Sequence, residues 1–377
     1  MIIALSRQTE MKERVTAAVN LTTIRRNYKH IKTLAGSECR VMAVVKADAY
    51  GHGAARVGSE LYEEGCRDFA VACLSEAQAI LNYVRGANIL ILGPTDVAHA
   101  GEIIESGFIQ AADSYEYCAE LAKHGRIKVH VKVDTGMSRI GIYCHHERDV
   151  KVAADEIERI SKLENIDIRG IFTHFADSDG SSDEFTKQQF AMFKMLLDEL
   201  EKRGINVGTR HCCNSAATLR YPEMRLDMVR AGIILYGLMP SDEVSDPEIR
   251  PAMKLSARIS AIHKLEKGDC VSYGCAYTAD RDTRIAVISI GYADGFSRVY
   301  SGRPLITVNG RTFATVGRIC MDMCMIDIGS DFDCRVGDEA VIFETAKQID
   351  EMAKVVGTIN YEIICSLRQR VLIEYIK

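Results

Sequence analysis

The sequence has no apolar run of the length that a membrane-spanning helix needs. Its apolar stretches, such as Ile89–Leu92 and Ile285–Ile290, fall far short of the roughly 20 residues that cross a bilayer. The short apolar start Met1–Leu5 is followed at once by charged residues, so we expect no signal peptide. No block of basic residues is present, and 47 Lys and Arg against 52 Asp and Glu give a formal net charge of −5. These absences argue against a membrane protein, a secreted protein and a nucleic-acid-binding protein.

Several catalytic and metal-binding motifs are also missing. There is no P-loop, no nucleophile elbow and no G-x-G-x-x-G dinucleotide loop. Two segments contain metal-capable residues, Cys144–Glu147 and Cys320–Cys324, but neither has the paired C-x-x-C or H-E-x-x-H spacing of a zinc site. The thirteen cysteines are odd in number and irregularly spaced, which is typical of reduced thiols. We therefore expect a cytoplasmic protein without a metal site.

What the sequence does contain is an alternation of short apolar runs with longer helical patterns. Its 377 residues, 47% of them apolar, are enough for two folded domains. β-Branched runs followed by helical periodicity are typical of βα units around a parallel sheet. Eight such units favour an α/β fold of the (β/α)8 TIM-barrel type; an open doubly wound sheet is the alternative, but its usual dinucleotide loop is missing. The eight runs are Val41–Val45, Phe69–Ala72, Ile89–Leu92, Phe108–Ala111, Val129–Val133, Ile168–Phe172, Thr209–Cys213 and Met228–Gly232.

The pattern changes after Met239 and Pro240. Short apolar runs now alternate with Gly, Asp and Asn turns at hairpin-like spacing, which predicts a mostly β domain. The acidic, turn-prone stretch Ser241–Pro247 is the expected connection. We therefore predict a barrel domain over residues 1–240 and a β-rich C-terminal domain over residues 241–377. The runs that carry the second prediction are Arg258–His263, Ile285–Ile290, Leu305–Val308, Cys324–Ile328 and Glu339–Ile342.

The first apolar run of the barrel ends in a lysine. Lys46 follows Val41–Val45, and a lysine at the end of a barrel strand places its amine at the barrel mouth, where cationic neighbours favour the neutral nucleophile. Taken alone, such a lysine is more often ion-paired or snorkelling. The whole string Val44-Val45-Lys46-Ala47-Asp48-Ala49-Tyr50-Gly51-His52-Gly53, however, resembles the pyridoxal-phosphate lysine motif of the alanine racemase family.

This resemblance continues in order along the chain. It implies the fold of that family, a (β/α)8 barrel followed by a β domain, and an isomerase that uses pyridoxal 5'-phosphate to interconvert L- and D-alanine. It also implies a head-to-tail homodimer in which the C-terminal domain of one subunit completes the site of the other. The matching blocks are Lys132–Gly141, Thr173–Phe175, Asn214–Ala217, Arg230–Ile233, Val271–Gly274, Gly291–Gly295, Gly317–Asp322 and Thr358–Glu362.

The resemblance implies two catalytic residues. Lys46 would hold the cofactor covalently and would then exchange the Cα proton on one face of the substrate. Tyr273, contributed by the partner subunit, would serve the opposite face, because inverting the configuration requires a proton donor on each side. A phenol ordinarily has a pKa of about 10, so Tyr273 needs nearby positive charge or hydrogen bonds to act as a base.

Most of the other matched residues would bind the cofactor. Arg230 would face the pyridine nitrogen, and a guanidinium has only donors, so that nitrogen would stay unprotonated and the electron sink would be weakened. His174 would support Arg230 and the ring, and Arg139 would contact the phenolate side of the cofactor. The phosphate would be held by Tyr50, Ser215, Gly232, Ile233 and Tyr361, whose hydroxyl and backbone N–H groups suit a dianion.

The remaining residues would bind the substrate or narrow its entrance. Arg139 and the backbone N–H of Met321 from the partner subunit would bind the substrate carboxylate. Lys132 would position Arg139, and some members of the family carry this lysine as a carbamate. Tyr292 and Tyr361 would restrict access to small amino acids, with Asp322 holding that gate.

Other functions remain open at this point. A serine or broad-specificity racemase of the same family is the first alternative. A decarboxylase of related fold would carry a different cysteine motif in its β domain, and a non-catalytic pyridoxal-phosphate-binding protein would have the barrel alone, whereas roughly 140 residues follow the barrel here. We expect a free-standing enzyme that supplies D-alanine for cell-wall peptidoglycan and binds neither membrane nor nucleic acid.

Overall fold

The computed structural model describes residues 13–377, which form two compact units. The barrel unit comprises Leu21–Ala252, and the β unit joins residues 13–20 to Met253–Lys377. No helix in the described part of the chain is long and apolar enough to cross a membrane.

The units divide at 252/253, whereas the change of sequence pattern lies at 240/241. Residues 241–252 belong with the barrel because they are hydrogen-bonded to it. The N–H of Ala252 donates to the carbonyl of Tyr236 at 3.0 Å, and the side-chain amide of Asn27 donates to the carbonyl of Arg250 at 2.8 Å.

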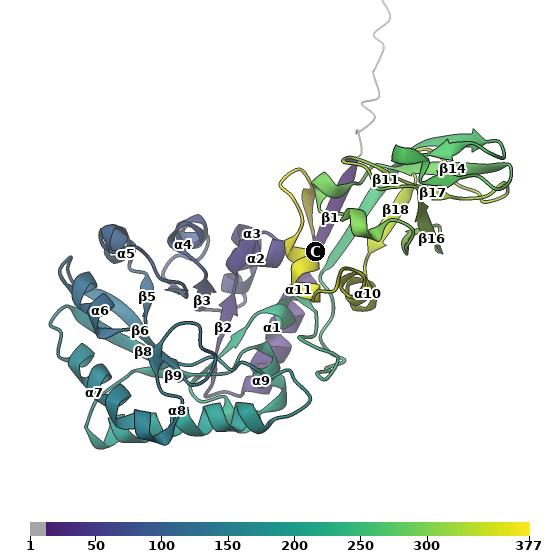
Figure 1. The fold of residues 1–377 in the computed structure, drawn as a ribbon. Helices are drawn as coiled ribbons and strands as arrows, with labels where there is room; N and C mark the ends of the chain where they lie inside the picture. The colour runs from purple at the N-terminus through teal and green to yellow at the C-terminus, as the bar shows by residue number, and fades with distance from the viewer. Residues whose placement is uncertain (1–12) are drawn as a thin grey trace, which may run out of the picture. The chain divides into compact units, whose positions relative to one another are not determined.

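The sheet of the barrel unit (Figure 1) is parallel and has nine strands, eight of which follow one another around the barrel. They pair in the order β10-β2-β3-β4-β5-β6-β8-β9. Strands β9 and β10 are joined by hydrogen bonds from the N–H groups of Asp227 and Arg230 to the carbonyls of Arg210 and Cys213, so the barrel is nearly closed. The predicted barrel is confirmed. Its strands are β2 (Arg40–Val44), β3 (Asp68–Val71), β4 (Asn88–Ile91), β5 (Ile109–Ala112), β6 (Ile127–Asp134), β8 (Ile166–Phe172), β9 (Thr209–His211) and β10 (Met228–Ala231), with the short β7 (Ile142–Tyr143) beside β6.

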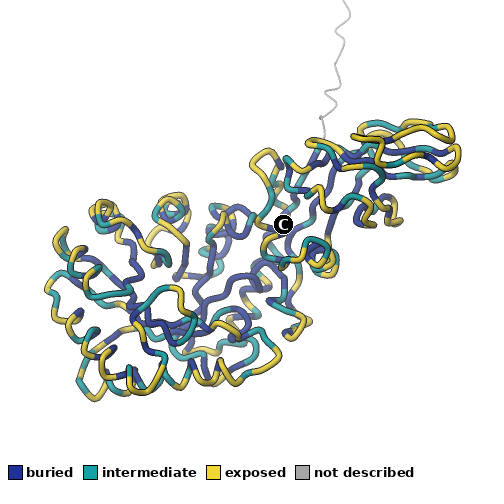
Figure 2. The backbone as a smooth tube through the Cα atoms, in the orientation of Figure 1, coloured by how far each residue is buried: buried dark blue, intermediate teal, exposed yellow. Residues whose placement is uncertain are grey.

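Helices surround these strands because each has one apolar face. In α7 (Val150–Ser161) the buried residues Val150, Ala153, Ala154 and Ile157 recur at three- and four-residue spacing. The strands are buried and the outer helix surfaces exposed in Figure 2. The other helices of the unit are α1 (Leu21–Ala35), α2 (Lys46–Gly51), α3 (Ala54–Glu63), α4 (Leu74–Leu81), α5 (Ala100–Ser106), α6 (Tyr115–Ala122), α8 (Glu184–Lys202) and α9 (Ser215–Arg220), with short 3-10 turns η1 (Val97–His99), η2 (Glu147–Asp149), η3 (Pro222–Met224) and η4 (Ile233–Tyr236).

The β unit contains a six-stranded antiparallel barrel, closed where β11 pairs with β14. The β-rich domain predicted from the sequence is therefore confirmed. Two helices, α10 and α11, complete it, and a capping box between Thr345 and Gln348 starts α10. The elements are β11 (Met253–Leu265), β12 (Cys270–Val271), η5 (Tyr273–Cys275), β13 (Tyr277–Thr278), β14 (Thr283–Ile288), η6 (Tyr292–Asp294), η7 (Arg298–Tyr300), β15 (Pro304–Val308), β16 (Arg311–Val316), β17 (Cys324–Asp327), β18 (Glu339–Phe343), α10 (Ala346–Val356) and α11 (Asn360–Cys365).

Both chain ends contribute strands to the β unit. Strand β1 (Val15–Asn20) pairs antiparallel with β11 on one side and parallel with β19 (Leu372–Ile376) on the other. Alternate residues of β1 are buried, which is the period-two pattern of a half-buried strand. The segment just before the barrel thus belongs to the C-terminal fold, which the sequence analysis did not predict.

Candidate active site

Polar side chains gather at the carboxyl ends of the barrel strands. Lys46 follows β2, Lys132 lies near the end of β6, His174 follows β8, and Arg230 lies on β10. The carboxyl ends of the strands face the same side of such a barrel, and barrel enzymes carry their chemistry there. Side chains from four strands are therefore available to one site.

Arg230 is fixed in the barrel interior by four acceptors. Its Nη1 donates to Nδ1 of His211 at 2.8 Å, and its Nη2 donates to the carbonyls of Thr173 and Cys212, each at 2.9 Å, and lies 3.1 Å from Nδ1 of His174. Burial lowers the pKa of the guanidinium to about 10, so it stays protonated at neutral pH. A group that faces Arg230 from the barrel mouth must therefore be an acceptor.

The imidazoles around Arg230 are neutral. Burial, followed by the charge of Arg230, lowers the pKa of both His174 and His211 well below the usual value. Because Nδ1 of His211 accepts from Arg230, its proton is on Nε2, which donates to Nδ1 of His130 at 2.9 Å. Burial lowers the pKa of His130 to about 3. Arg230, His211 and His130 thus form one chain of hydrogen bonds that carries a single positive charge.

His130 and His211 are not among the site residues predicted from the sequence. His130 lies two residues before Lys132 on β6, so the two side chains share a face of that strand. His211 ends β9 and stacks on Phe172 of β8, with ring centroids 4.9 Å apart. The two-residue spacing of His130 and Lys132 could have indicated that both side chains face the same site. The contact between His130 and His211 could not be predicted in this way, because the two residues are 81 positions apart.

Lys132 is a buried amine beside this chain. Its side chain is 3% exposed, and Nζ donates to the carbonyl of Val133 at 2.7 Å. Burial, together with the charges of Arg230 and Arg139, lowers the pKa of the amine to about 7. Lys132 therefore carries a substantial neutral fraction at physiological pH.

Arg139 lies on a loop that is shaped by the carboxylate of Asp134. One oxygen of Asp134 accepts the N–H groups of Gly136, Met137 and Ser138 at 2.9 to 3.1 Å, which curls the loop just before Arg139. Arg139 is exposed, and the described residues include no ion-pair partner for it. An exposed guanidinium at the barrel mouth can bind an incoming anion.

His174 lies within electrostatic reach of every cation of the site. After burial, the charges that lower its pKa belong to Arg230, Lys132, Arg139 and Lys46, in decreasing order of effect. Of these four residues, Arg230 is in direct contact with His174, and the charges of the other three also act on its imidazole.

Lys46 begins a left-handed turn. The four residues after it, Ala47 to Tyr50, have φ between 50° and 55° and ψ between 41° and 50°. Each non-glycine residue in this conformation costs roughly 1–2 kcal/mol, and such strain is found at functional sites. The turn is held by hydrogen bonds from the N–H of Ala47 to Glu76 Oε1 and from the N–H of Ala54 to Asp48 Oδ1, each 2.7 Å.

Tyr50, Ser215 and Gly232 form a small polar cradle. The N–H of Gly232 donates to the hydroxyl of Ser215 at 2.9 Å. A Cβ on Gly232 would lie 2.7 Å from the hydroxyl oxygen of Tyr50 and 3.6 Å from that of Ser215, so any side chain at this position would fill the cradle. Ile233 follows as the first residue of η4. Two hydroxyls and the backbone N–H groups of η4 suit a bound phosphate.

The other predicted site residues belong to the β unit. Tyr273, Met321 and Tyr292 are exposed, by 69%, 52% and 43%. Tyr273 lies at the tip of the β12–β13 hairpin, and Tyr361 lies on α11.

Two loops of the β unit are linked beside Tyr273. The hydroxyl of Ser272 donates to the carbonyl of Arg318 at 2.6 Å and lies 3.5 Å from the thiol of Cys320. The guanidinium of Arg318 reaches Gly274, where a Cβ would lie 3.1 Å from Nη1. The hairpin that carries Tyr273 is thus attached to the loop that carries Met321, with the guanidinium of Arg318 beside Gly274.

Comparison with known proteins covers nearly the whole chain. Residues 19–240 match the family described as "Alanine racemase, N-terminal domain", and residues 252–375 match "Alanine racemase, C-terminal domain". An alanine racemase of Desulforamulus reducens is 41% identical over 369 residues, which cover 96% of this chain and 98% of that protein. Alanine racemase 1 of Clostridium acetobutylicum is 40% identical over 374 residues, which cover 96% and 95%.

Solved structures give the same result. An alanine racemase of Clostridium difficile 630 is 39% identical, with a TM-score of 0.91 and coverage of 97% of both chains. The Bacillus anthracis alanine racemase with bound L-Ala-P is 32% identical, with a TM-score of 0.89 and coverage of 97% of this chain and 95% of that one. The chain belongs to the alanine racemase family, a family of isomerases, as the sequence motifs predicted.

Proposed function

We propose that this protein interconverts L- and D-alanine with pyridoxal 5'-phosphate. The observation that carries the proposal is the arrangement of Arg230, which is held by two neutral imidazoles at the end of the barrel that also carries Lys46 and the Tyr50–Ser215–Gly232 cradle. The relatives named alanine racemase cover 94–96% of this chain, which supports the same activity.

The residues present fit this cofactor. The cradle around Gly232, with Ile233 and Tyr361, would hold the phosphate, and Arg230 would donate to the ring nitrogen. His174 would lie against the ring, and Arg139 would contact the phenolate oxygen. When bound, pyridoxal phosphate withdraws electrons from the Cα of an attached amino acid, which makes the Cα proton acidic.

The residues of the chain would supply the proton transfers. Lys46 would hold the cofactor and would move a proton to or from Cα on one face. Tyr273 of the partner subunit would do the same on the other face.

Substrate binding would rest on Arg139 and on Met321 of the partner subunit. The exposed guanidinium of Arg139 would pair with the substrate carboxylate, and the backbone N–H of Met321 would donate to it. Lys132 would position Arg139. Tyr292, Tyr361 and Asp322 would narrow the entrance, which favours alanine over larger substrates; a preference for serine is the alternative.

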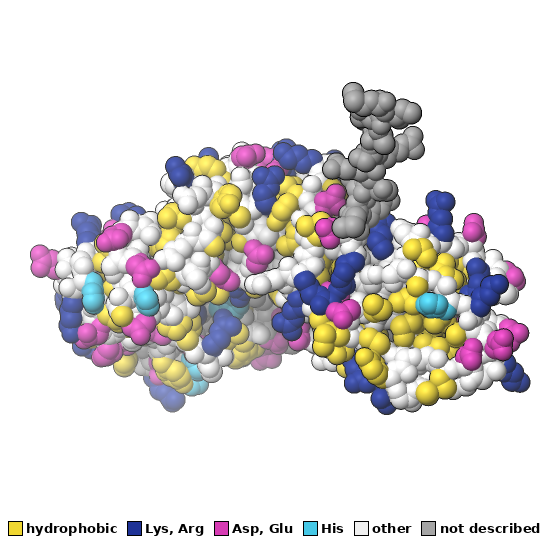
Figure 3. Space-filling model, turned by 90° about the horizontal axis from the view of Figure 1, so that it is seen from above, with side chains coloured by type: hydrophobic (Ala, Val, Ile, Leu, Met, Phe, Trp, Pro, Cys, Tyr) yellow, Lys and Arg dark blue, Asp and Glu magenta, His cyan; other side chains and the backbone are white. Residues whose placement is uncertain are grey.

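The assembly would be a head-to-tail homodimer. Hydrophobic side chains gather on the face of the β unit that Figure 3 shows. The exposed large hydrophobic residues of this unit include Tyr273, Met321 and Met323. Apolar residues clustered on a surface favour contact with another protein surface. A location in the cytoplasm and a role in supplying D-alanine for peptidoglycan stay predictions.

The decisive experiment is an assay of the purified protein with pyridoxal phosphate and L-alanine. D-Alanine should accumulate until both enantiomers are equal, measured with a D-amino-acid oxidase. Borohydride should attach the cofactor to Lys46, located by peptide mass spectrometry. L-Serine at the same concentration tests the alternative substrate. Absence of any D-amino acid from either substrate would contradict the proposal.

A further inference from the structure

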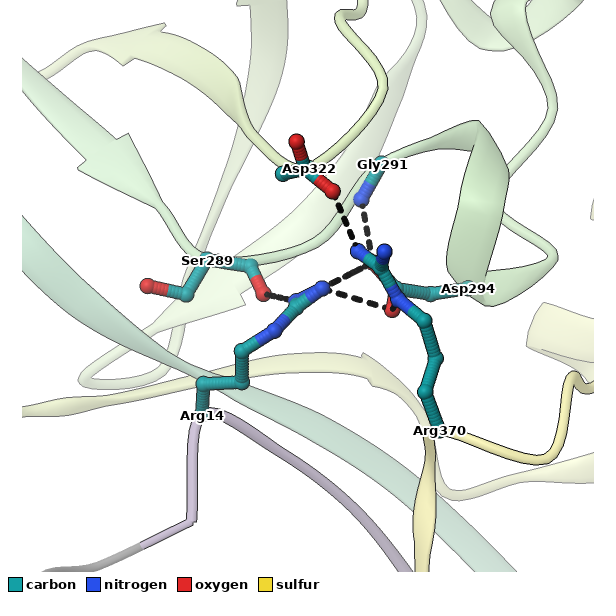
Figure 4. A network of polar contacts seen from close by, with 6 residues as sticks. All are labelled: Arg14, Ser289, Gly291, Asp294, Asp322 and Arg370. Atoms are coloured by element: carbon teal, nitrogen blue, oxygen red, sulfur yellow. Dashed lines mark hydrogen bonds and ion pairs between the residues drawn. The ribbon is translucent and has the colours of Figure 1, made fainter.

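The β unit contains a buried carboxylate held by two arginines (Figure 4). Asp294 ends the turn η6 and is fully buried. It accepts hydrogen bonds from Nη2 of Arg14 at 2.7 Å, from Nε of Arg370 at 2.6 Å and from the N–H of Gly291 at 2.9 Å. Arg14 also donates to the carbonyl of Ser289 at 2.6 Å. Two guanidiniums from opposite ends of the chain thus converge on one turn.

The two arginines differ in one respect. Arg370 uses its remaining Nη2 to donate to Asp322 at 2.6 Å, so its guanidinium bridges a buried carboxylate and a half-exposed one (Figure 4). Hydrogen bonds to Asp294 and Asp322 raise the pKa of Arg370, which keeps the bridge charged. Arg14 makes no contact with Asp322 among the bonds drawn in this network.

The bridge joins two loops that are already in backbone contact. The N–H of Tyr292 donates to the carbonyl of Cys320 at 3.1 Å, and the N–H of Ala293 donates to that of Met321 at 3.0 Å. A Cβ on Gly291 would collide with both of these carbonyl oxygens, so only glycine permits this approach. The loop of Tyr292 and the loop of Met321 and Asp322 are therefore bonded to each other, and Asp294 and Arg370 attach them to the rest of the unit.

We propose that Arg370, anchored by Asp294, is a positioning residue that sets the place of Asp322 and Met321 at the substrate entrance. The inference rests on the proposed function, because that proposal assigns Met321 to the substrate carboxylate and Asp322 to the gate. Holding both loops fixes where the Met321 N–H points and how wide the entrance is. Arg370, which donates to Asp294 and Asp322, would act on the site only through Asp322.

Steady-state kinetics of three variants test this role. Arg370→Lys keeps the charge but cannot bridge two carboxylates, and Asp322→Asn removes the charge of the outer partner. Arg14→Lys is the matched control, because it weakens the same contact to Asp294 without touching Asp322. Half-exposed ion pairs are worth up to about 1 kcal/mol, so we expect KM for both alanine enantiomers to rise about two- to fivefold in Arg370→Lys and Asp322→Asn, with kcat nearly unchanged.

Two further readouts separate positioning from general stability. The double variant Arg370→Lys/Asp322→Asn should raise KM no more than the stronger of its two single variants, because both substitutions break the same contact between Arg370 and Asp322. Arg14→Lys should lower the melting temperature about as much as Arg370→Lys while changing KM much less. The ratio of kcat/KM for serine to that for alanine should rise in Arg370→Lys and not in Arg14→Lys.

The outcomes distinguish this inference from the proposed function. If the wild-type protein racemises alanine but Arg370→Lys and Arg14→Lys change KM equally, or the double variant is additive, the positioning role is wrong and the network is only structural. If the wild-type protein racemises neither alanine nor serine, the proposed function fails, and this inference fails with it.

Discussion

The two units present their predicted site residues in opposite ways. In the barrel unit Lys132 and Arg230 are each under 5% exposed; Lys132 donates to the carbonyl of Val133, and Arg230 donates to the carbonyls of Thr173 and Cys212, which follow neighbouring strands. In the β unit Tyr273 and Met321 are more than half exposed, on a hairpin tip and a loop.

This difference indicates what each set of predicted residues depends on. The buried set has its partners within the unit, and its shifted pKa values follow from burial. The exposed set gains a buried environment only if another surface covers it, as the proposed dimer would. Variants in the barrel should therefore alter the chemistry itself, whereas variants in the β unit should act through the partner subunit.

The largest effect is expected from Lys46→Ala. It removes the amine at the end of β2, and loss of such a nucleophile and base should lower racemisation by roughly 10³-fold or more. Absorbance of bound cofactor and D-alanine formation measure the two consequences. Lys123→Ala, which changes an exposed lysine paired with Glu120, is the matched control and should leave both unchanged. A Lys46→Ala protein with full activity would place the cofactor on another lysine.

Tyr273→Phe tests the exposed residues of the β unit. Loss of one general base should slow racemisation by about 10²- to 10⁴-fold, because the phenyl ring cannot exchange a proton. Because equilibrium fixes the final D-to-L ratio, the effect on each face must be measured as the rate of Cα hydrogen exchange in deuterated water. That rate should fall far more for one alanine enantiomer than for the other. Equal loss from both would contradict the assignment of the two faces.

Mixing two inactive proteins shows whether the site is shared. A dimer of one Lys46→Ala subunit and one Tyr273→Phe subunit would have one site with both native residues. Activity should therefore return on mixing. If labelled subunits demonstrably exchange and no activity returns, Tyr273 does not act across the interface.

Arg230→Glu should change which product forms. The carboxylate would favour a protonated ring nitrogen, which strengthens the electron sink and allows the cofactor carbon to take the proton. We expect racemisation to fall by about 10²-fold and the share of turnovers that yield pyruvate to rise, measured with lactate dehydrogenase. Arg230→Lys keeps the positive charge and should not raise that share. An equal pyruvate share in both variants would show that Arg230 has only a structural role.

The sequence predicted the barrel well because its strands are buried on both sides. Such strands appear in the sequence as continuous apolar runs, and all eight predicted runs overlap strands of the sheet. The place of Lys46 followed from the end of the first run. Because the following residues, Ala47 to Tyr50, have no preference for left-handed backbone, the turn that carries Tyr50 toward Gly232 was not predictable.

Long-range contacts account for most of what the sequence analysis missed. Strand β1 pairs with β11 and β19, about 240 and 355 residues away, and nothing local to Val15–Asn20 specifies those partners. The chain from Arg230 through His211 to His130 likewise joins three strands. The roles of the site residues came from motifs and stay predictions.

The smallest effect concerns the pH dependence of stability. Burial, with the charges of Arg230 and Arg139, lowers the pKa of Lys132 to about 7, whereas a lysine in an unfolded chain has a pKa of about 10.4. Between these values the unfolded chain binds more protons than the folded one, so the free energy of unfolding rises with pH on account of this group. Below pH 7 the amine is charged in both states, and its burial costs stability in full.

Lys132→Met removes the titrating amine and isolates this contribution. The free energy of unfolding of the wild type relative to Lys132→Met should increase from pH 7 to pH 9 by on the order of 1 kcal/mol per pH unit. Urea denaturation in carbon-dioxide-free buffer measures it, because a carbamate on Lys132 would change the charge of the folded state. Lys128→Met, at a partly exposed position of the same strand, is the matched control for the substitution. If the difference in the free energy of unfolding between the wild type and Lys132→Met does not change with pH, the buried amine keeps its proton, and the charges of Lys132 and Arg230 coexist within the barrel.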